Sequence, residues 1–237
     1  MREGVLNRRI LLLSSFLCGA CVMVLELAGS RVIAPYMGTS LVVWTSLIGI
    51  IMLSLTLGYW LGGVVSDRCP RPELLSNIIG AAAVVTIIVA LAADPLLSAL
   101  SGGVRNVYAA SVIASALLFS VPSALLGMVS PFIVRLAMQS VASSGGTVGK
   151  FSAMSSAGSI LGTFLGGFVL ISFFSSLTII FMVAFVLGLV AVLLRGASSK
   201  AARAPHAVIV IAAVLLGGLS EVNMLFMKPD GIVLETQ

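Results

Sequence analysis

Three charged residues lie inside or beside long apolar stretches, where a charge is chemically most informative. Glu26 and Arg31 stand near the end of the first stretch, and Arg135 stands near the end of a later one. Charges at membrane depth are costly, so they usually pair with one another or line a polar path. Glu26 and Arg31 are five residues apart, which is poor spacing for a direct pair on a helix. The partner of either could instead be Arg135 or Asp67 from another helix. We therefore predict that Glu26, Arg31 and Arg135 form a candidate intramembrane polar site. The alternative is that they only anchor their helices at the membrane interface.

A second group of charges closes the apolar stretch that contains Gly62 and Gly63. Asp67 and Arg68 come after three further residues, and Arg71 follows shortly. An aspartate at a helix end can pair with an arginine or cap the N-terminus of a neighbouring helix. We expect this segment to be a loop that latches helices together; an ordinary charged cytoplasmic turn is the alternative.

Glycines recur four positions apart in two parts of the chain. Small residues at this spacing lie on one face of a helix and let a second helix approach closely. No strand pattern precedes them and no Gly-x-Gly-x-x-Gly occurs, which excludes a nucleotide-binding loop. We therefore expect helix packing, and no ligand, at Gly58, Gly62, Gly158, Gly162 and Gly166.

Side chains that could perform catalysis or bind a metal are scarce. Cys18 and Cys21 have the spacing of a redox pair, but they lie in an apolar stretch without the strand–helix–strand context that such a pair needs. Three cysteines cannot supply a four-ligand zinc site, and the histidine, His206, lies in a basic segment. We therefore assign no catalytic residue, no metal ligand and no cofactor to this chain.

The composition is that of a membrane protein. Hydrophobic residues make up 59% of the 237 residues and charged residues 9%, whereas an ordinary soluble domain has about 25% charged residues. So few charges cannot cover a soluble surface, which excludes a soluble enzyme, a disordered protein and a disulfide-built secreted domain. The net charge of +5 is scattered between apolar blocks, which argues against nucleic acid as a partner. The expected partner is the lipid bilayer.

The apolar stretches predict an all-α integral membrane protein with about seven transmembrane helices; six and eight are the alternatives. They are long enough for helices, which need about 20 residues to cross a bilayer, and too long for barrel strands. Pro122 and Pro131 should kink or break the fourth helix. We expect helices at 10–28, 41–65, 74–93, 107–138 and, divided near 172–176, in two parts of 151–194. The predicted organisation is an N-terminal segment at 1–9, a six-helix module at 10–195, a basic loop at 196–206, a seventh helix at 207–227 and a tail at 228–237.

The distribution of Lys and Arg predicts the orientation. Ten of the 13 basic residues fall at one end of the predicted bundle. Because cytoplasmic loops carry the excess of positive charge, the N-terminus is expected in the cytoplasm. Seven crossings would place the C-terminus outside. The larger group is Arg2, Arg8, Arg9, Arg68, Arg71, Arg135, Lys150, Arg195, Lys200 and Arg203, and the smaller group is Arg31, Arg105 and Lys228.

Several segments in order resemble a known family. They are LELAGSRVIAPYMGTS at 25–40, VWTS at 43–46, LGYWLGG at 57–63, GMVSP at 127–131 followed by Arg135, GKFSA at 149–153 and GSILGT at 158–163. Together they resemble the membrane-embedded module of the fused bacterial spermidine synthases, which are polyamine aminopropyltransferases. The loop with Asp67 and Arg68 resembles the signature loop of the major facilitator superfamily, although the glycine that follows in that signature is absent.

The resemblance covers about residues 10–195 and implies a six-helix half of a major facilitator fold in a bacterial inner membrane. It implies that the module anchors a separate aminopropyltransferase domain or handles its polyamine substrate or product. The glycine-rich loop and acidic pocket of that catalytic domain are not found in these 237 residues. Two alternatives stay open. One is a stand-alone polyamine or small-molecule transporter built from half-facilitator subunits, with Glu26 as its acidic site. The other is a structural assembly protein that forms homo-oligomers.

Overall fold

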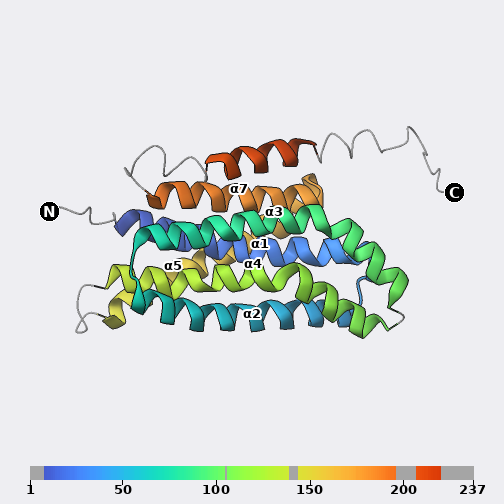
Figure 1. The fold of residues 1–237 in the computed structure, drawn as a ribbon, viewed down its shortest axis with the longest axis horizontal. Helices are drawn as coiled ribbons and strands as arrows, with labels where there is room; N and C mark the ends of the chain where they lie inside the picture. Colours follow the sequence, from blue (N-terminus) through green and yellow to red (C-terminus); the bar gives the residue numbers. More distant parts are fainter. Residues whose placement is uncertain (1–7, 105, 139–143, 196–206, 220–237) are drawn as a thin grey trace.

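The structure, a computed structural model, describes residues 8–104, 106–138, 144–195 and 207–219. Every regular element in these residues is helical. Six helices are long and apolar enough to cross a membrane, and they lie side by side as one bundle (Figure 1). The elements are α1 (Arg8–Met37), α2 (Leu41–Arg68), α3 (Pro72–Gly103), α4 (Val107–Ala137), α5 (Ser144–Phe164), the π-helix η2 (Leu165–Leu170), α6 (Ile171–Phe173) and α7 (Ser176–Arg195). The elements α5, η2 and α6 together form one span.

Local sequence explains where several helices begin and end. Gly38 has φ 79°, a left-handed conformation that suits glycine, and it makes the turn from α1 to α2. Pro72 occupies the start of α3, where its missing N–H costs nothing. Asn106 caps α4, because its side-chain oxygen accepts hydrogen bonds from the N–H groups of Tyr108 and Ala109.

The all-helical prediction is confirmed, and several predicted boundaries are wrong. α1 continues through Pro35 and α3 continues through Pro95, beyond their predicted ends. α4 agrees with the predicted helix at 107–138 and runs without a break through Pro122 and Pro131. Neighbouring helices and hydroxyl side chains can satisfy the backbone groups that proline frees, so proline does not end a membrane helix as it would a soluble one. The expected loop at 94–106 is therefore mostly helix.

The expected seventh crossing at 207–227 is described in part. A helix at Ala207–Leu219 lies along α7, and residues 220–227 are outside the described residues. The described helix is shorter than the about 20 residues that a crossing needs. Contacts with α7 come from Gly188, which lies near Val210, and from Gly217, which lies near Phe181.

The six long spans form two similar halves of three consecutive spans. The first half is α1, α2 and α3, and the second is α4, the span from α5 to α6, and α7. α2 packs chiefly on α4, and α5 packs in the same way on α1. α3 also contacts α4, as α7 contacts α1, and α3 and α7 meet each other. Because each half has an odd number of crossings, the halves have opposite topology, the arrangement called an inverted repeat.

The register of the glycine contacts supports this repeat. The close approaches at Gly58 and Gly62 of α2 recur one hundred positions later, at Gly158 and Gly162 of α5. Gly58 and Gly62 of α2 face Ala124 and Met128 of α4, while Gly158 and Gly162 of α5 face Phe16 and Ala20 of α1. Gly127 of α4 faces Leu55 and Gly19 of α1 faces Ser155. The predicted packing glycines therefore lie in two equivalent helix seams; Gly166 lies against the side chain of Leu27.

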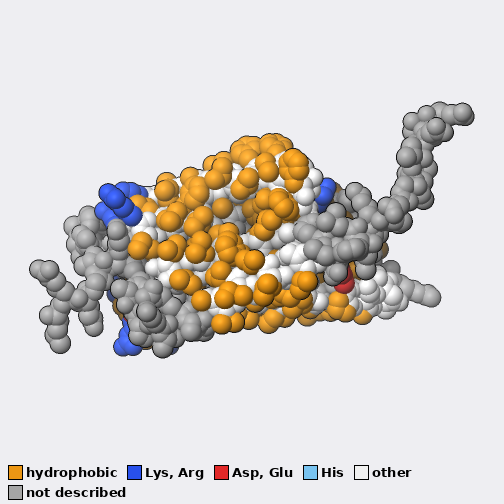
Figure 2. Space-filling view, turned by 90° about the horizontal axis from the view of Figure 1, so that it is seen from above, with side chains coloured by type: hydrophobic (Ala, Val, Ile, Leu, Met, Phe, Trp, Pro, Cys, Tyr) orange, Lys and Arg blue, Asp and Glu red, His pale blue; other side chains and the backbone are white. Residues whose placement is uncertain are grey.

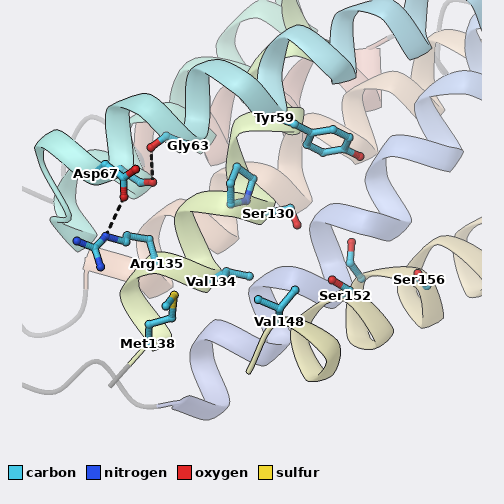
Figure 3. A pocket seen from close by; sticks show the side chains of 13 residues that line it. Tyr59, Gly63, Asp67, Ser130, Val134, Arg135, Met138, Val148, Ser152 and Ser156 are labelled. Atoms are coloured by element: carbon cyan, nitrogen blue, oxygen red, sulfur yellow. Dashed lines mark hydrogen bonds and ion pairs between the residues drawn. The ribbon is translucent and has the colours of Figure 1, made fainter. Parts of the chain in front are cut away.

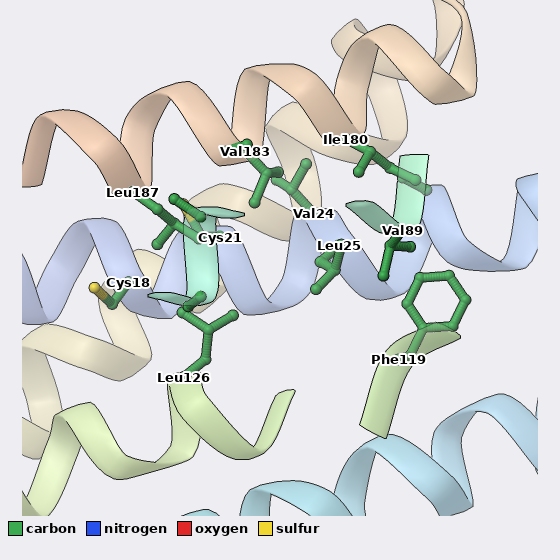
Figure 4. Packing of buried hydrophobic residues seen from close by; sticks show 14 of the residues in the cluster. Cys18, Cys21, Val24, Leu25, Val89, Phe119, Leu126, Ile180, Val183 and Leu187 are labelled. Atoms are coloured by element: carbon green, nitrogen blue, oxygen red, sulfur yellow. The ribbon is translucent and has the colours of Figure 1, made fainter. Parts of the chain in front are cut away.

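The core lies between α1, α3, α4 and α7 (Figure 4). Leu25 of α1, Val89 of α3 and Ile180 of α7 are all buried there. Phe119 of α4 is fully buried, and its ring lies against Gly29, where an added Cβ would come within 2.8 Å of the ring. Cys18 and Cys21 are buried free thiols within this apolar packing. α1 is thus the central helix of the bundle, and it contacts helices of its own half and of the other half.

Most of the charged side chains that the structure describes lie at the ends of the bundle; Glu26, inside α1, is an exception. Figure 2 shows a broad apolar surface between the ends, with basic side chains gathered mainly at one of them. That end, called the basic end below, holds the start of α1, the ends of α2, α4 and α7 and the start of α5. Its described cations are Arg8, Arg9, Arg68, Arg71, Arg135, Lys150 and Arg195. The opposite end carries Arg31 near the end of α1.

Candidate functional site

A cavity of about 580 Å³ opens at the basic end between α2, α4 and α5 (Figure 3). Hydroxyl groups from all three helices line it, with few other polar groups. The hydroxyl-bearing residues are Tyr59 and Ser66 of α2, Ser130 of α4, and Ser152, Ser155 and Ser156 of α5. Hydroxyls both donate and accept hydrogen bonds, so this lining can bind a polar solute of either charge.

An ion pair lies at the wide end of this cavity. Arg135 Nε of α4 lies 3.1 Å from Asp67 Oδ1 of α2. The two side chains are 44% and 73% exposed, so water screens the pair. Next to it, Ser66 Oγ donates a hydrogen bond of 2.9 Å to the carbonyl of Gly63. The aspartate therefore joins α2 to α4.

Arg68 and Arg71, the other residues of the expected latching loop, are exposed at this end. The described hydrogen bonds of Arg71 are made by its backbone. Its carbonyl accepts hydrogen bonds of 3.1 and 3.3 Å from the N–H groups of Leu74 and Leu75, which starts α3. The geometry of this loop places the helix connection on Asp67 rather than on its two arginines.

A smaller cavity of about 60 Å³ lies deeper in the bundle. Tyr59, Ser130 and Ser155 line both cavities, so the inner one adjoins the outer one on the side of α1. Its wall includes Ser15, Cys18, Gly19 and Val22 of α1 and Ser159 of α5. The polar space therefore narrows from the basic end toward the middle of the bundle.

Two hydrogen bonds fix the seam between α1 and α5 beside the inner cavity. Ser15 Oγ donates to the carbonyl of Phe151, and Ser159 Oγ donates to the carbonyl of Gly19, both over 3.1 Å. In a membrane such bonds add to the close packing that glycine allows. They hold the hydroxyl groups of both helices at the wall of the cavity.

Glu26 continues the stripe of α1 that lines the inner cavity. Ser15, Gly19, Val22 and Glu26 follow one another at spacings of four, three and four, which keeps them on one helix face. Glu26 is half-buried, about 6 Å along the helix from Val22. Among the described residues, no hydrogen bond or ion pair engages its carboxyl group. An acidic group therefore stands just beyond the narrow end of the polar space.

The three residues of the predicted intramembrane polar site are not brought together. Arg135 lies with Asp67 at the basic end, whereas Arg31 lies near the opposite end of α1. Arg31 Nη1 donates a hydrogen bond of 3.4 Å to the carbonyl of Ile171 in α6. Five residues separate Glu26 from Arg31, which is about 140° around a helix, so the two face different neighbours.

The hydroxyl lining is the part of the site that the sequence analysis did not find. Ser152, Ser155, Ser156 and Ser159 occur within two turns of α5, a helix whose other exposed residues are mostly apolar. Serine clustered at helical spacing inside a membrane span was the available signal. A hydroxyl can also bond to its own helix backbone, as Thr163 does, so the pattern alone does not predict a cavity.

The groups that line the site have a definite hydrogen-bonding and charge character. Hydroxyl groups, one ion pair and a nearby carboxylate can hold a solute with several hydrogen-bond donors and a positive charge. In the described residues no cluster of three His, Cys, Asp or Glu residues could hold a metal ion. Comparisons with protein-family models, with curated proteins and with solved structures find no match to this chain.

Proposed function

We propose that this chain is a membrane module that handles a small cationic amine, which enters the cavity between α2, α4 and α5. The observation that carries the proposal is the pair of adjoining cavities, whose polar groups are mostly hydroxyls. It begins beside Asp67 at the basic end and narrows past the hydroxyls of Tyr59 and Ser130. It stops one turn short of Glu26 on the same face of α1. A lipid-facing helix bundle has no packing need for such a space.

The charge of the solute follows from the two carboxylates. Asp67 is mostly exposed and is held only by a screened ion pair, so an ammonium group can compete with Arg135 for it. Glu26 lies within the membrane without a described partner, a placement that usually marks an ion or solute path. Polyamines carry several ammonium groups separated by methylenes, so one ammonium group can lie at a carboxylate while the others donate hydrogen bonds to the hydroxyl lining.

The resemblance to the fused spermidine synthases identifies the context of this activity. In that reading the basic end faces the cytoplasm of a bacterial cell, and the module handles the substrate or product of an aminopropyltransferase domain. Seven described Lys and Arg residues at that end favour this orientation. The module also anchors the enzyme domain to the inner membrane.

A second candidate is a stand-alone transporter in which two copies form a complete facilitator-like path. The inverted repeat of three and three helices favours it, because transporter folds are commonly built from such repeats. The solute and the cavity are the same in both candidates. They differ in whether the second half is another copy of this chain or is replaced by an enzyme partner.

Flux of labelled spermidine across proteoliposomes tests the proposed function. The wild-type protein is expected to move or exchange the amine, and Glu26→Gln is expected to abolish the flux because it removes the acidic group. Glu73→Gln is the matched control, because Glu73 is an exposed carboxylate at the start of α3 and does not line the cavity. Equal flux for wild type, Glu26→Gln and empty liposomes would refute the proposal.

A further inference from the structure

A second cavity, of about 350 Å³, lies on the other side of α1 and has a purely apolar wall. It runs between α1, the α5–η2 span and α7. Leu17 and Val24 of α1, Leu165 and Leu170 of η2, and Val186 of α7 are among the residues that line it. Because α5 and α7 each pack on α1 but have no substantial contact with each other, a groove is left between them.

Arg31 lies at one end of this groove. Leu17, Val24 and Arg31 follow one another at intervals of seven residues, which places them in one stripe of α1. Arg31 is about 10 Å beyond Val24 along the helix axis. Its guanidinium is tied to the carbonyl of Ile171, the residue directly after Leu170 of the groove wall. The cation and the apolar groove therefore form one continuous surface.

The guanidinium has hydrogen-bonding capacity to spare. Arginine has five N–H donors, and one bond of 3.4 Å to a carbonyl is found within the described residues. Arg31 is exposed. The other Lys and Arg residues that the structure describes lie at the basic end, so among these residues Arg31 is the cation nearest to the groove.

The internal repeat indicates that the groove beside α1 has no equivalent at the matching position of α4, in the other half. The register that pairs Phe16 with Ala124 and Ala20 with Met128 also pairs Val24 with Phe132. Phe132 is fully buried in α4. Val24 is much smaller, so α1 leaves space where the equivalent position of α4 fills it with an aromatic ring.

From this geometry we infer that the groove binds one anionic phospholipid. An acyl chain lies in the apolar cavity between α1, η2 and α7, and the phosphate accepts hydrogen bonds from Arg31. The apolar wall suits a lipid tail, which is thin enough to enter where a whole helix is not. Arginine binds phosphate oxygens through charge-assisted hydrogen bonds. A headgroup without a cation of its own leaves the full negative charge of the phosphate to Arg31, which accounts for a preference for an anionic headgroup. This inference does not depend on the amine-handling proposal.

Lipid retention by the purified protein tests the inference. The protein is delipidated in detergent and then titrated with phosphatidylglycerol or with phosphatidylcholine of the same acyl chains, and bound lipid is counted by native mass spectrometry. The wild-type protein is expected to bind one phosphatidylglycerol about tenfold or more tightly than phosphatidylcholine, because the choline cation of the latter neutralises the phosphate that Arg31 would bind. Glycerol phosphate without acyl chains is expected not to bind measurably.

Variants separate the headgroup from the tail. Arg31→Gln should abolish the preference for phosphatidylglycerol and leave the retention of either lipid similar. Val24→Phe, which copies the other half of the repeat, and Val186→Phe, at a partly exposed position of α7, should each lower retention of both lipids. Arg8→Gln at the basic end is the control and should change nothing.

Folding of each variant is checked by its helical circular dichroism and its elution as a monodisperse species. Equal binding of the two lipids by the wild type would overturn the headgroup assignment. Unchanged retention in a folded Val24→Phe or Val186→Phe protein would overturn the groove assignment. Binding of glycerol phosphate as tight as that of the lipid would show an anion site without a tail.

Discussion

Arg135 Nε and Asp67 Oδ1 lie 3.1 Å apart and connect α4 to α2 at the wide end of the polar cavity. Both side chains are substantially exposed, so the ion pair connects the two helices and remains accessible to water. This arrangement suits a contact that a solute can open. Asp67, a residue of the expected latching loop, thus takes part in an ion pair between helices.

The ion pair should contribute little to stability. Asp67→Asn, Arg135→Gln and the double variant are compared by unfolding in detergent, and the coupling free energy is expected to be about 0.2–1 kcal/mol, as for exposed pairs. A coupling of several kcal/mol would mean that the pair is buried in the membrane-embedded protein. A coupling of zero would mean that the two residues do not interact.

Neighbouring glycines of α2 should respond to alanine with opposite signs. At Gly62 an added Cβ would come within 2.6 Å of the backbone of Met128, whereas at Gly63 nothing lies within 4 Å. Gly62→Ala should lower the free energy of unfolding by about 1–3 kcal/mol through overpacking. Gly63→Ala should raise it by about 0.5–1 kcal/mol, because glycine is the poorer helix former. Equal effects would contradict the described seam between α2 and α4.

The second seam should behave like the first. Gly162→Ala brings a Cβ within 2.7 Å of the Cα of Ala20, so the same loss of about 1–3 kcal/mol is expected. Gly149→Ala, in the first turns of α5 where nothing lies within 4 Å, is the matched control. If Gly162→Ala is neutral while Gly62→Ala is destabilising, the two halves do not share one packing register.

Phe119 should be a main contributor to the core. Its ring is fully buried against Gly29 and close to Val89 (Figure 4). Phe119→Ala leaves a cavity and is expected to cost about 3–5 kcal/mol of unfolding free energy. Leu117→Ala, on the exposed face of the same helix, should stay within about 0.5 kcal/mol of wild type. Similar losses for both would show that the exposed face of α4 is covered by another protein surface.

Thiol labelling should report the orientation. Cys69 is exposed at the basic end, while Cys18 and Cys21 are buried. A membrane-impermeant maleimide should therefore label the protein in inside-out membrane vesicles and leave it unlabelled in intact cells or spheroplasts. Cys69→Ser should remove the labelling. Labelling from the outside would reverse the proposed orientation of the basic end.

Much of the fold is contained in local sequence. Apolar stretches long enough to cross a bilayer predict the helices, and glycines four apart predict which faces approach closely. The ends of α1 and α3 were misplaced, since both helices continue beyond the predicted ends and through Pro35 and Pro95. A membrane helix tolerates proline where a soluble helix would end. The spacing shared by Gly58–Gly62 and Gly158–Gly162 is a sign of the internal repeat in the sequence. The contacts of these glycines with α4 and α1 are needed to recognise it.

The site was harder to predict, since its members are close in space and distant in sequence. Asp67 and Arg135 belong to helices whose pairing no local pattern specifies. Glu26 and Arg31 stand close together in sequence and differ in their surroundings, because five residues turn a helix by about 140°. Tyr59 and Ser130 carry ordinary polar groups that become a lining only when α2, α4 and α5 leave a space between them.

Equilibrium binding of labelled spermidine to the purified protein tests the central claim most directly. Saturable binding is expected for the wild type. It should be lost in Glu26→Gln, retained in Glu73→Gln and weakened in Tyr59→Phe, with all variants folded by circular dichroism. Salt should weaken the binding, because it screens the partly exposed carboxylate of Asp67. Absence of saturable binding by the folded wild type, or binding that Glu26→Gln leaves unchanged, would contradict the assignment of the cavity and Glu26 to a cationic amine.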